Sequence, residues 1–137
     1  MFNTILFPID RSREAQEAVA VAIDLVQKYQ SKLILLSVVE TPDPDAEIID
    51  DPVMQSPEAI DRLLHSAQTL FAKQGIQAEI LQRKGKPAFT ICDVADELNV
   101  SLIVMGSSGS GLDVEHATES VSSRVIDLSP CPVLIVP

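Results

Sequence analysis

The chain has little of what several common classes of protein depend on. Its 137 residues include no Trp, and aromatic residues make up only 4% of them. Basic residues are also scarce, with 10 Lys and Arg against 20 Asp and Glu, so the net charge is −10. An acidic surface repels phosphate backbones and anionic lipid headgroups at long range. We therefore expect neither nucleic acid nor a membrane among its partners.

Targeting segments and metal-ligand patterns are missing as well. No apolar run approaches the ~20 residues that a membrane-spanning helix needs. Met1 leads straight into a strand-like segment, without the basic region and cleavage site of a signal peptide. Cys92 and Cys131 form no C-x-x-C pair, and His65 and His116 stand apart from other metal ligands. We expect a cytoplasmic protein with reduced thiols and no metal site.

What the chain does contain is a regular alternation of two hydrophobic patterns. A length of 137 residues suits one domain, residues 1–137, and 46% hydrophobic residues with few aromatics require an aliphatic core. Apolar runs of strand length alternate with stretches of helical period, which is typical of βαβ units. We predict an α/β fold, namely a doubly wound, five-stranded, mostly parallel sheet with helices on both faces.

Each predicted element has its own signal in the sequence. The strands are short apolar runs, namely Thr4 to Ile9, Lys32 to Val39, Ala78 to Leu81, Leu102 to Met105 and Val133 to Val136. The first helix is predicted from an apolar stripe from Ala15 to Val26, and the second lies between the N-cap Ser56 and the stop at Gly75. Pro87 opens the third helix, in which the inward residues are Ala88, Ile91, Cys92, Ala95 and Leu98. The last helix is marked by Val121, Val125 and Leu128.

An acidic segment interrupts this pattern between the second strand and the second helix. Residues 40 to 56 contain six carboxylates, three prolines and no Lys or Arg. The 17 residues exceed a usual connection of this kind. Two interpretations remain open, a lid over the edge of the sheet or a solvated excursion.

The segment from Met105 to Gly111 is rich in glycine and directly follows a buried strand. Ligands of doubly wound sheets bind beyond the carboxyl ends of the strands, and glycine lets backbone amides approach a phosphate. The alternative is a glycine-rich turn that only makes a tight corner. It is not a P-loop, because Leu112 and Asp113 replace the required Lys and Ser/Thr, and Ser110 breaks the nucleophile elbow. The dinucleotide fingerprint also fails, since the turn after the first strand lacks glycine.

Four motifs in this order and spacing resemble the universal stress protein family over nearly the whole chain. They are the opening ILFPID (Ile5–Asp10), the GKP segment (Gly85–Pro87), the M-G-x-x-G loop from Met105 and the ending SPCPVLIVP from Ser129. The resemblance implies an adenine nucleotide alpha hydrolase-like fold with the strand order 3-2-1-4-5.

The resemblance also implies a set of site residues. Nucleotide-binding members of the family have the pattern G-x2-G-x9-G-[ST], which falls here on Gly106, Gly109, position 119 and Ser120. By this carry-over Asp10 would hold the ribose and Pro8 and Val38 would border the adenine. The phosphates would contact Gly106, Gly109, Ser120 and Val121, and Met105 would lie beside them.

This sequence departs from the pattern at the third glycine, which is Glu119. The dipole of the following helix stabilises a carboxylate there by roughly 0.3–1 kcal/mol. A phosphate charge about 4 Å away would be repelled by about 4 kcal/mol at an effective dielectric near 20. The neighbouring residues 110 to 118 offer no Lys or Arg. Either Glu119 abolishes triphosphate binding and limits the site to AMP, adenosine or a cyclic nucleotide, or it faces solvent and leaves binding intact.

These observations lead to an expected function and to two alternatives. We expect a non-catalytic stress-response binding protein, with AMP or ATP as candidate ligands and Mg²⁺ required only for a triphosphate. A nucleotide sensor or slow ATP hydrolase is the first alternative. A flavodoxin-like electron carrier fits the charge and the sheet, but the chain has no Trp and one Tyr to stack on a flavin. The resemblance and the apolar last strand, Val133 to Val136, imply a homodimer paired through that strand.

Overall fold

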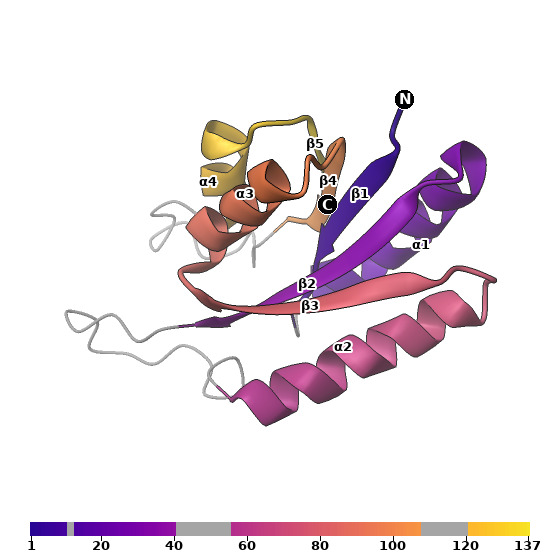
Figure 1. The fold of residues 1–137 in the computed structure, drawn as a ribbon, viewed down its shortest axis with the longest axis horizontal. Helices are drawn as coiled ribbons and strands as arrows, with labels where there is room; N and C mark the ends of the chain where they lie inside the picture. Colours follow the sequence, from indigo (N-terminus) through magenta and orange to yellow (C-terminus); the bar gives the residue numbers. More distant parts are fainter. Residues whose placement is uncertain (11–12, 41–55, 108–120) are drawn as a thin grey trace.

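Five parallel strands form one sheet in the order β3-β2-β1-β4-β5 in the computed structural model, which describes residues 1–10, 13–40, 56–107 and 121–137 (Figure 1). The strands are β1 (Thr4–Pro8), β2 (Lys32–Glu40), β3 (Ala78–Gly85), β4 (Leu102–Gly106) and β5 (Val133–Val136). The predicted fold class and strand order are therefore confirmed. The central strand β1 pairs with β2 on one side and with β4 on the other.

Helices cover both faces of the sheet. They are α1 (Arg13–Tyr29), α2 (Pro57–Ala72), α3 (Pro87–Glu97) and α4 (Val121–Leu128). Helices α1 and α2 pack on one face, and α3 and α4 pack together on the other (Figure 1). Within the described residues, no helix is long and apolar enough to cross a bilayer.

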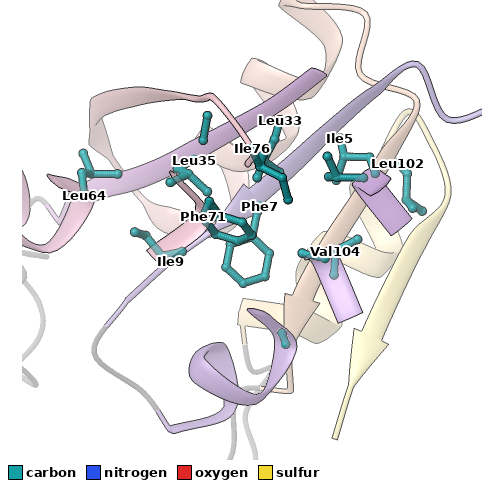
Figure 2. Packing of buried hydrophobic residues seen from close by; sticks show 14 of the residues in the cluster. Ile5, Phe7, Ile9, Leu33, Leu35, Leu64, Phe71, Ile76, Leu102 and Val104 are labelled. Atoms are coloured by element: carbon teal, nitrogen blue, oxygen red, sulfur yellow. The ribbon is translucent and has the colours of Figure 1, made fainter. Parts of the chain in front are cut away.

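The period of two along each strand divides the core into two layers. On β1, Ile5 and Phe7 face α1 and α2, whereas Leu6 faces α3 and α4. The first layer is mostly aliphatic, and Phe7 meets Phe71 of α2 edge to face at 6.0 Å between ring centroids (Figure 2). Since both faces of β1, β2 and β4 are buried, these strands appear in the sequence as nearly continuous apolar runs.

Both ends of α2 follow local rules that the sequence contains. The Ser56 hydroxyl accepts a hydrogen bond from the Ala59 amide at 3.4 Å, as an N-cap residue does. At the other end, the Ile76 amide donates to the Phe71 carbonyl at 3.0 Å, and Gly75 has a positive φ of 79°. This is a Schellman motif with glycine at C′, so the predicted stop at Gly75 is confirmed.

Several predicted boundaries and facings differ from the structure. Strand β3 continues through Gln82–Lys84 to Gly85, because these polar residues lie on an edge strand and need no burial to pair with β2. Leu98 was expected to face inward, but it directly follows the last residue of α3 and is 37% exposed. Val94, which the helical stripe did not include, is buried in α3. Most of the acidic segment lies outside the described residues.

Candidate functional site

The winding of the chain reverses between β1 and β4. The segment after β1 leads to α1 on one face of the sheet, and the segment after β4 leads to α4 on the other. Two connections that leave in opposite directions leave space between them at the carboxyl ends of their strands, where doubly wound proteins bind ligands. The candidate site therefore lies beyond Pro8 and Gly106, the last residues of β1 and β4.

Four of the predicted site residues line the α3 and α4 face at this edge. Val38 and Met105 are 5% and 6% exposed and belong to the core layer under those helices. Half-buried Val121, the first residue of α4, packs against the same layer. Pro8 follows Leu6 of that layer by two positions, so the strand period places it on the same face. All four are apolar and lie on this face, at the carboxyl ends of their strands or at the start of α4, and we call them the site floor.

The end of β4 is held against the neighbouring strand. Gly106 pairs with Val136 of β5, and the Ser107 amide donates to the Val136 carbonyl at 2.9 Å. These contacts hold the end of β4 in place up to Ser107. Gly109 and Ser120 were predicted to meet phosphates, but they and Glu119 lie outside the described residues.

The end of β1 is held by its other neighbour, β2. Proline has no backbone N–H, so the next donor along the strand is the Ile9 amide, which bonds to the Leu36 carbonyl at 2.8 Å. The Ile9 carbonyl in turn accepts a hydrogen bond from the buried Ser37 hydroxyl at 3.0 Å. The exposed Asp10 follows immediately. The structure thus brings Asp10 to the same edge as the site floor.

The sequence interpretation overlooked Ser37. It lies in the second strand as the one hydroxyl within the otherwise apolar run Leu33–Val39. Its side chain is 1% exposed. A buried hydroxyl needs a hydrogen-bond partner, which was the available signal that Ser37 contacts a backbone group of a neighbouring strand.

A thiol lies behind the site floor, in the layer under α3. Burial raises the pKa of Cys92 above its ordinary value of 9.0, and the charge of Asp93 and nearby Cys131 raise it further. The Cys92 Sγ lies 3.9 Å from the Val125 carbonyl of α4. Because the thiolate is the nucleophile, a raised pKa keeps this thiol unreactive near neutral pH. Cys92 is therefore a packing residue between α3 and α4.

The described residues also contain no group of three or more His, Cys, Asp or Glu side chains arranged to hold a metal ion. They leave no buried side-chain nitrogen or oxygen without a hydrogen-bond partner. The buried polar side chains of the described residues are thus satisfied within the fold.

The sequence and the structure were both compared with known proteins, and both comparisons indicate the same family. Residues 1–137 match the family model described as Usp, the universal stress protein family. Universal stress protein Sll1654 of Synechocystis sp. is 56% identical over 137 residues, which are 100% of this chain and 87% of that protein.

Two solved structures have the same fold. Universal stress protein UspA from Lactobacillus plantarum superposes with a TM-score of 0.77 at 29% identity, covering 99% of this chain and 98% of that one. A universal stress protein in complex with cAMP superposes with a TM-score of 0.78 at 24% identity, covering 98% of this chain and 97% of that one. At that lower identity the second likeness concerns the fold alone.

Proposed function

The chain belongs to the universal stress protein family, and we propose that it binds an adenine nucleotide where the winding of its sheet reverses. The observation that carries the proposal is the meeting of the site floor with Asp10 and the end of β4 at one edge. An apolar wall beside a few convergent polar groups is the usual composition of a small-molecule site. The fold is also one that holds cAMP in another protein.

Each part of the edge suits a different part of the nucleotide. Pro8 and Val38 offer apolar surface to the adenine, and the Asp10 carboxylate can accept hydrogen bonds from ribose hydroxyls. The backbone beyond Met105 and the start of α4 at Val121 then meet the phosphate, which a helix N-terminus stabilises. Gly106, Gly109 and Ser120 complete this part of the site through the sequence pattern.

We propose further that the site prefers a monophosphate or cyclic nucleotide over ATP. The pattern places Glu119 where a glycine would let phosphates approach, and its charge opposes each additional phosphate. AMP or cAMP carries less negative charge than ATP and needs less space at that position. Mg²⁺ would contribute only with a triphosphate, whose charge it offsets.

Isothermal titration calorimetry with AMP, cAMP, ADP and ATP, with and without Mg²⁺, tests both statements. We expect saturable binding of AMP or cAMP, weakened by Asp10→Ala, and at least about 10-fold tighter ATP binding in Glu119→Gly. Glu119→Gln is the matched control, because it removes the charge and keeps the bulk. If neither the native protein nor Glu119→Gly binds any nucleotide, the edge is an unused remnant of the fold.

We also propose that the bound nucleotide is not turned over. The positions of the P-loop Lys and Ser/Thr are Leu112 and Asp113, and the glycine-rich segment lacks the nucleophile elbow. Release of inorganic phosphate from Mg-ATP should therefore stay at the background rate. Saturable release that Asp10→Ala abolishes would instead establish the slow hydrolase.

A homodimer through β5 is the last part of the proposal. This strand, Val133–Val136, is at the edge of the sheet, where one side of its backbone has no strand partner in the described residues. Its Leu134 side chain is 38% exposed. Exposed apolar edge strands promote pairing with other chains, so covering this edge with a second copy is favourable.

A further inference from the structure

We propose that Ser37 is a positioning residue for Asp10 and so determines how strongly the site recognises ribose hydroxyls. The inference rests on the proposed nucleotide site, whose ribose contact is Asp10. It adds a residue that touches no ligand and acts through the backbone of β1.

The geometry that carries the inference is the anchoring of Ile9. The side chain of Ile9 is 7% exposed and packs in the layer under α1 and α2. Its amide donates to the Leu36 carbonyl at 2.8 Å, and its carbonyl accepts from the Ser37 hydroxyl at 3.0 Å. The side chain, amide and carbonyl of Ile9 are thus all held in place by contacts within the fold. Ile9 directly precedes Asp10.

The role of the hydroxyl follows from where β1 ends. The strand ladder ends at Pro8, and the carbonyl of Ile9 belongs to the peptide unit that joins it to Asp10. The orientation of this peptide plane sets the direction in which the next Cα and its carboxylate leave the sheet. By bonding to that carbonyl, Ser37 extends the ordered part of β1 up to the ligand-binding side chain. A site supported by such bonds is held more precisely than one on an unsupported loop.

A purely structural role for Ser37 predicts a different behaviour, so the two can be separated. A buried hydroxyl that only satisfies a carbonyl would affect folding and every ligand equally when removed. A hydroxyl that positions Asp10 would affect a ligand only through the groups that Asp10 contacts. Ligands with and without ribose hydroxyls therefore distinguish the two roles.

The experiment measures the dissociation constants of AMP and of 2′,3′-dideoxy-AMP for the native protein and for Ser37→Ala. We expect Ser37→Ala to weaken AMP about 10-fold, the effect of losing one good hydrogen bond, and to leave dideoxy-AMP nearly unchanged. Ser37→Thr retains the hydroxyl and should restore AMP binding. In an Asp10→Ala background, Ser37→Ala should have no further effect on AMP.

Leu33→Val is the matched control for general weakening of the core. Leu33 lies in the same strand and faces the same layer, but it pairs with Ile5 near the other end of β1. It should lower stability without changing the ratio of the two dissociation constants. If Ser37→Ala does not fold, Ser37→Cys, which keeps the volume with a much weaker donor, is measured in its place.

Three results would separate failure of the inference from failure of the proposed function. Equal weakening of AMP and dideoxy-AMP in Ser37→Ala assigns Ser37 a structural role alone and overturns the inference. An unchanged AMP affinity overturns it as well. Absence of AMP binding by the native protein overturns the nucleotide site itself and the inference with it.

Discussion

At the scale of single residues, the turn between β3 and α3 depends on the absence of a side chain. Gly85 has a positive φ of 152°, a conformation that other residues rarely adopt. A Cβ atom on Gly85 would lie 2.5 Å from the Thr90 Oγ1 of α3. The Thr90 hydroxyl would therefore have to change its rotamer to make room for that Cβ. Strain and crowding therefore both favour glycine at this position.

We expect Gly85→Ala to lower the free energy of unfolding by about 1–2 kcal/mol. Urea denaturation measures the loss. In a Thr90→Ala background the same substitution should cost less, because the crowding is gone and the backbone strain remains. An equal cost in both backgrounds would show that only the strain matters.

The buried thiol of Cys92 gives a second prediction at this scale. Its pKa lies above 9.0 in the folded protein because burial disfavours the thiolate. The folded state therefore holds this proton more tightly than the unfolded state. The resulting stability is fully present below the unfolded pKa and is lost as the pH rises through the folded pKa.

Denaturation of the native protein and of Cys92→Ala at several pH values checks this. Above pH 9.0, the unfolding free energy of the native protein should fall more steeply than that of the variant, by at most about 1.4 kcal/mol per pH unit. The difference between the two unfolding free energies cancels the contribution of other groups that titrate in this pH range. Parallel curves would contradict a raised pKa at Cys92.

At the scale of elements, three helices end in the same way with different residues. Gln30, Gly75 and Asn99 follow α1, α2 and α3, and each has a positive φ, of 52°, 79° and 52°. In each case the next amide bonds back to a carbonyl five residues earlier, which completes a Schellman motif. Glycine adopts this conformation without cost and asparagine tolerates it, whereas glutamine does so at a disadvantage.

We therefore expect Gln30→Gly to raise the free energy of unfolding by about 0.5–1 kcal/mol. Gln30 is exposed, so the substitution removes no core packing. The reverse substitution at α2, Gly75→Gln, is the matched control and should lower stability by a similar amount, since a Cβ there meets no atom within 4 Å. Thermal denaturation of both variants measures the two effects, and equal signs would refute the explanation.

The sequence predicts an element well where burial of apolar side chains defines it, and poorly where only backbone pairing between strands defines it. Continuous apolar runs placed β2, β4 and β5 nearly to the residue. For β2 and β4 the reason is that parallel strands buried on both faces carry their own signal. The polar half of β3, Gln82–Gly85, has no such signal, since it is defined by backbone pairing with β2 and not by apolar burial. The helical stripe also overestimated burial at Leu98, because this residue lies just beyond the last turn of α3.

The candidate site was predictable in part for the same reason. Pro8, Val38 and Met105 lie at the end of an apolar run or one residue before it, and the strand order brings such ends together at one edge. For Ser37 the sequence indicates only that a buried hydroxyl needs a partner, because the identity of that partner, the Ile9 carbonyl, depends on the register between two strands. The sequence alone does not contain that register.

At the scale of the whole molecule, the two edges of the sheet have opposite character. Strand β3 is long and carries charged residues such as Glu79 and Arg83, which discourage pairing with another chain. Strand β5 is short and apolar, with the sequence VLIV. The molecule is thus protected at one edge and suited to self-association at the other.

We expect Leu134→Lys to convert the proposed dimer into a monomer, because a charge on the exposed edge opposes strand pairing. Light scattering should then report a mass near 14.8 kDa, that of one chain. Leu70→Lys is the matched control, since Leu70 is 52% exposed on α2, which packs on β2 and β3 at the other side of the sheet. A native protein that is already monomeric at micromolar concentration would refute the β5 dimer.

The central place of β1 also has a consequence for synthesis on the ribosome. Its partner β2 follows after one helix, but β4 begins only at Leu102, with 93 residues between it and Pro8. At a translation rate of about 5–20 residues per second, roughly 5–20 s pass before that partner exists. During this time the nascent chain can already pack most of the layer around Phe7 while one edge of β1 stays open. Until β4 is made, β1 therefore has an unpaired edge that is open to pairing with other chains.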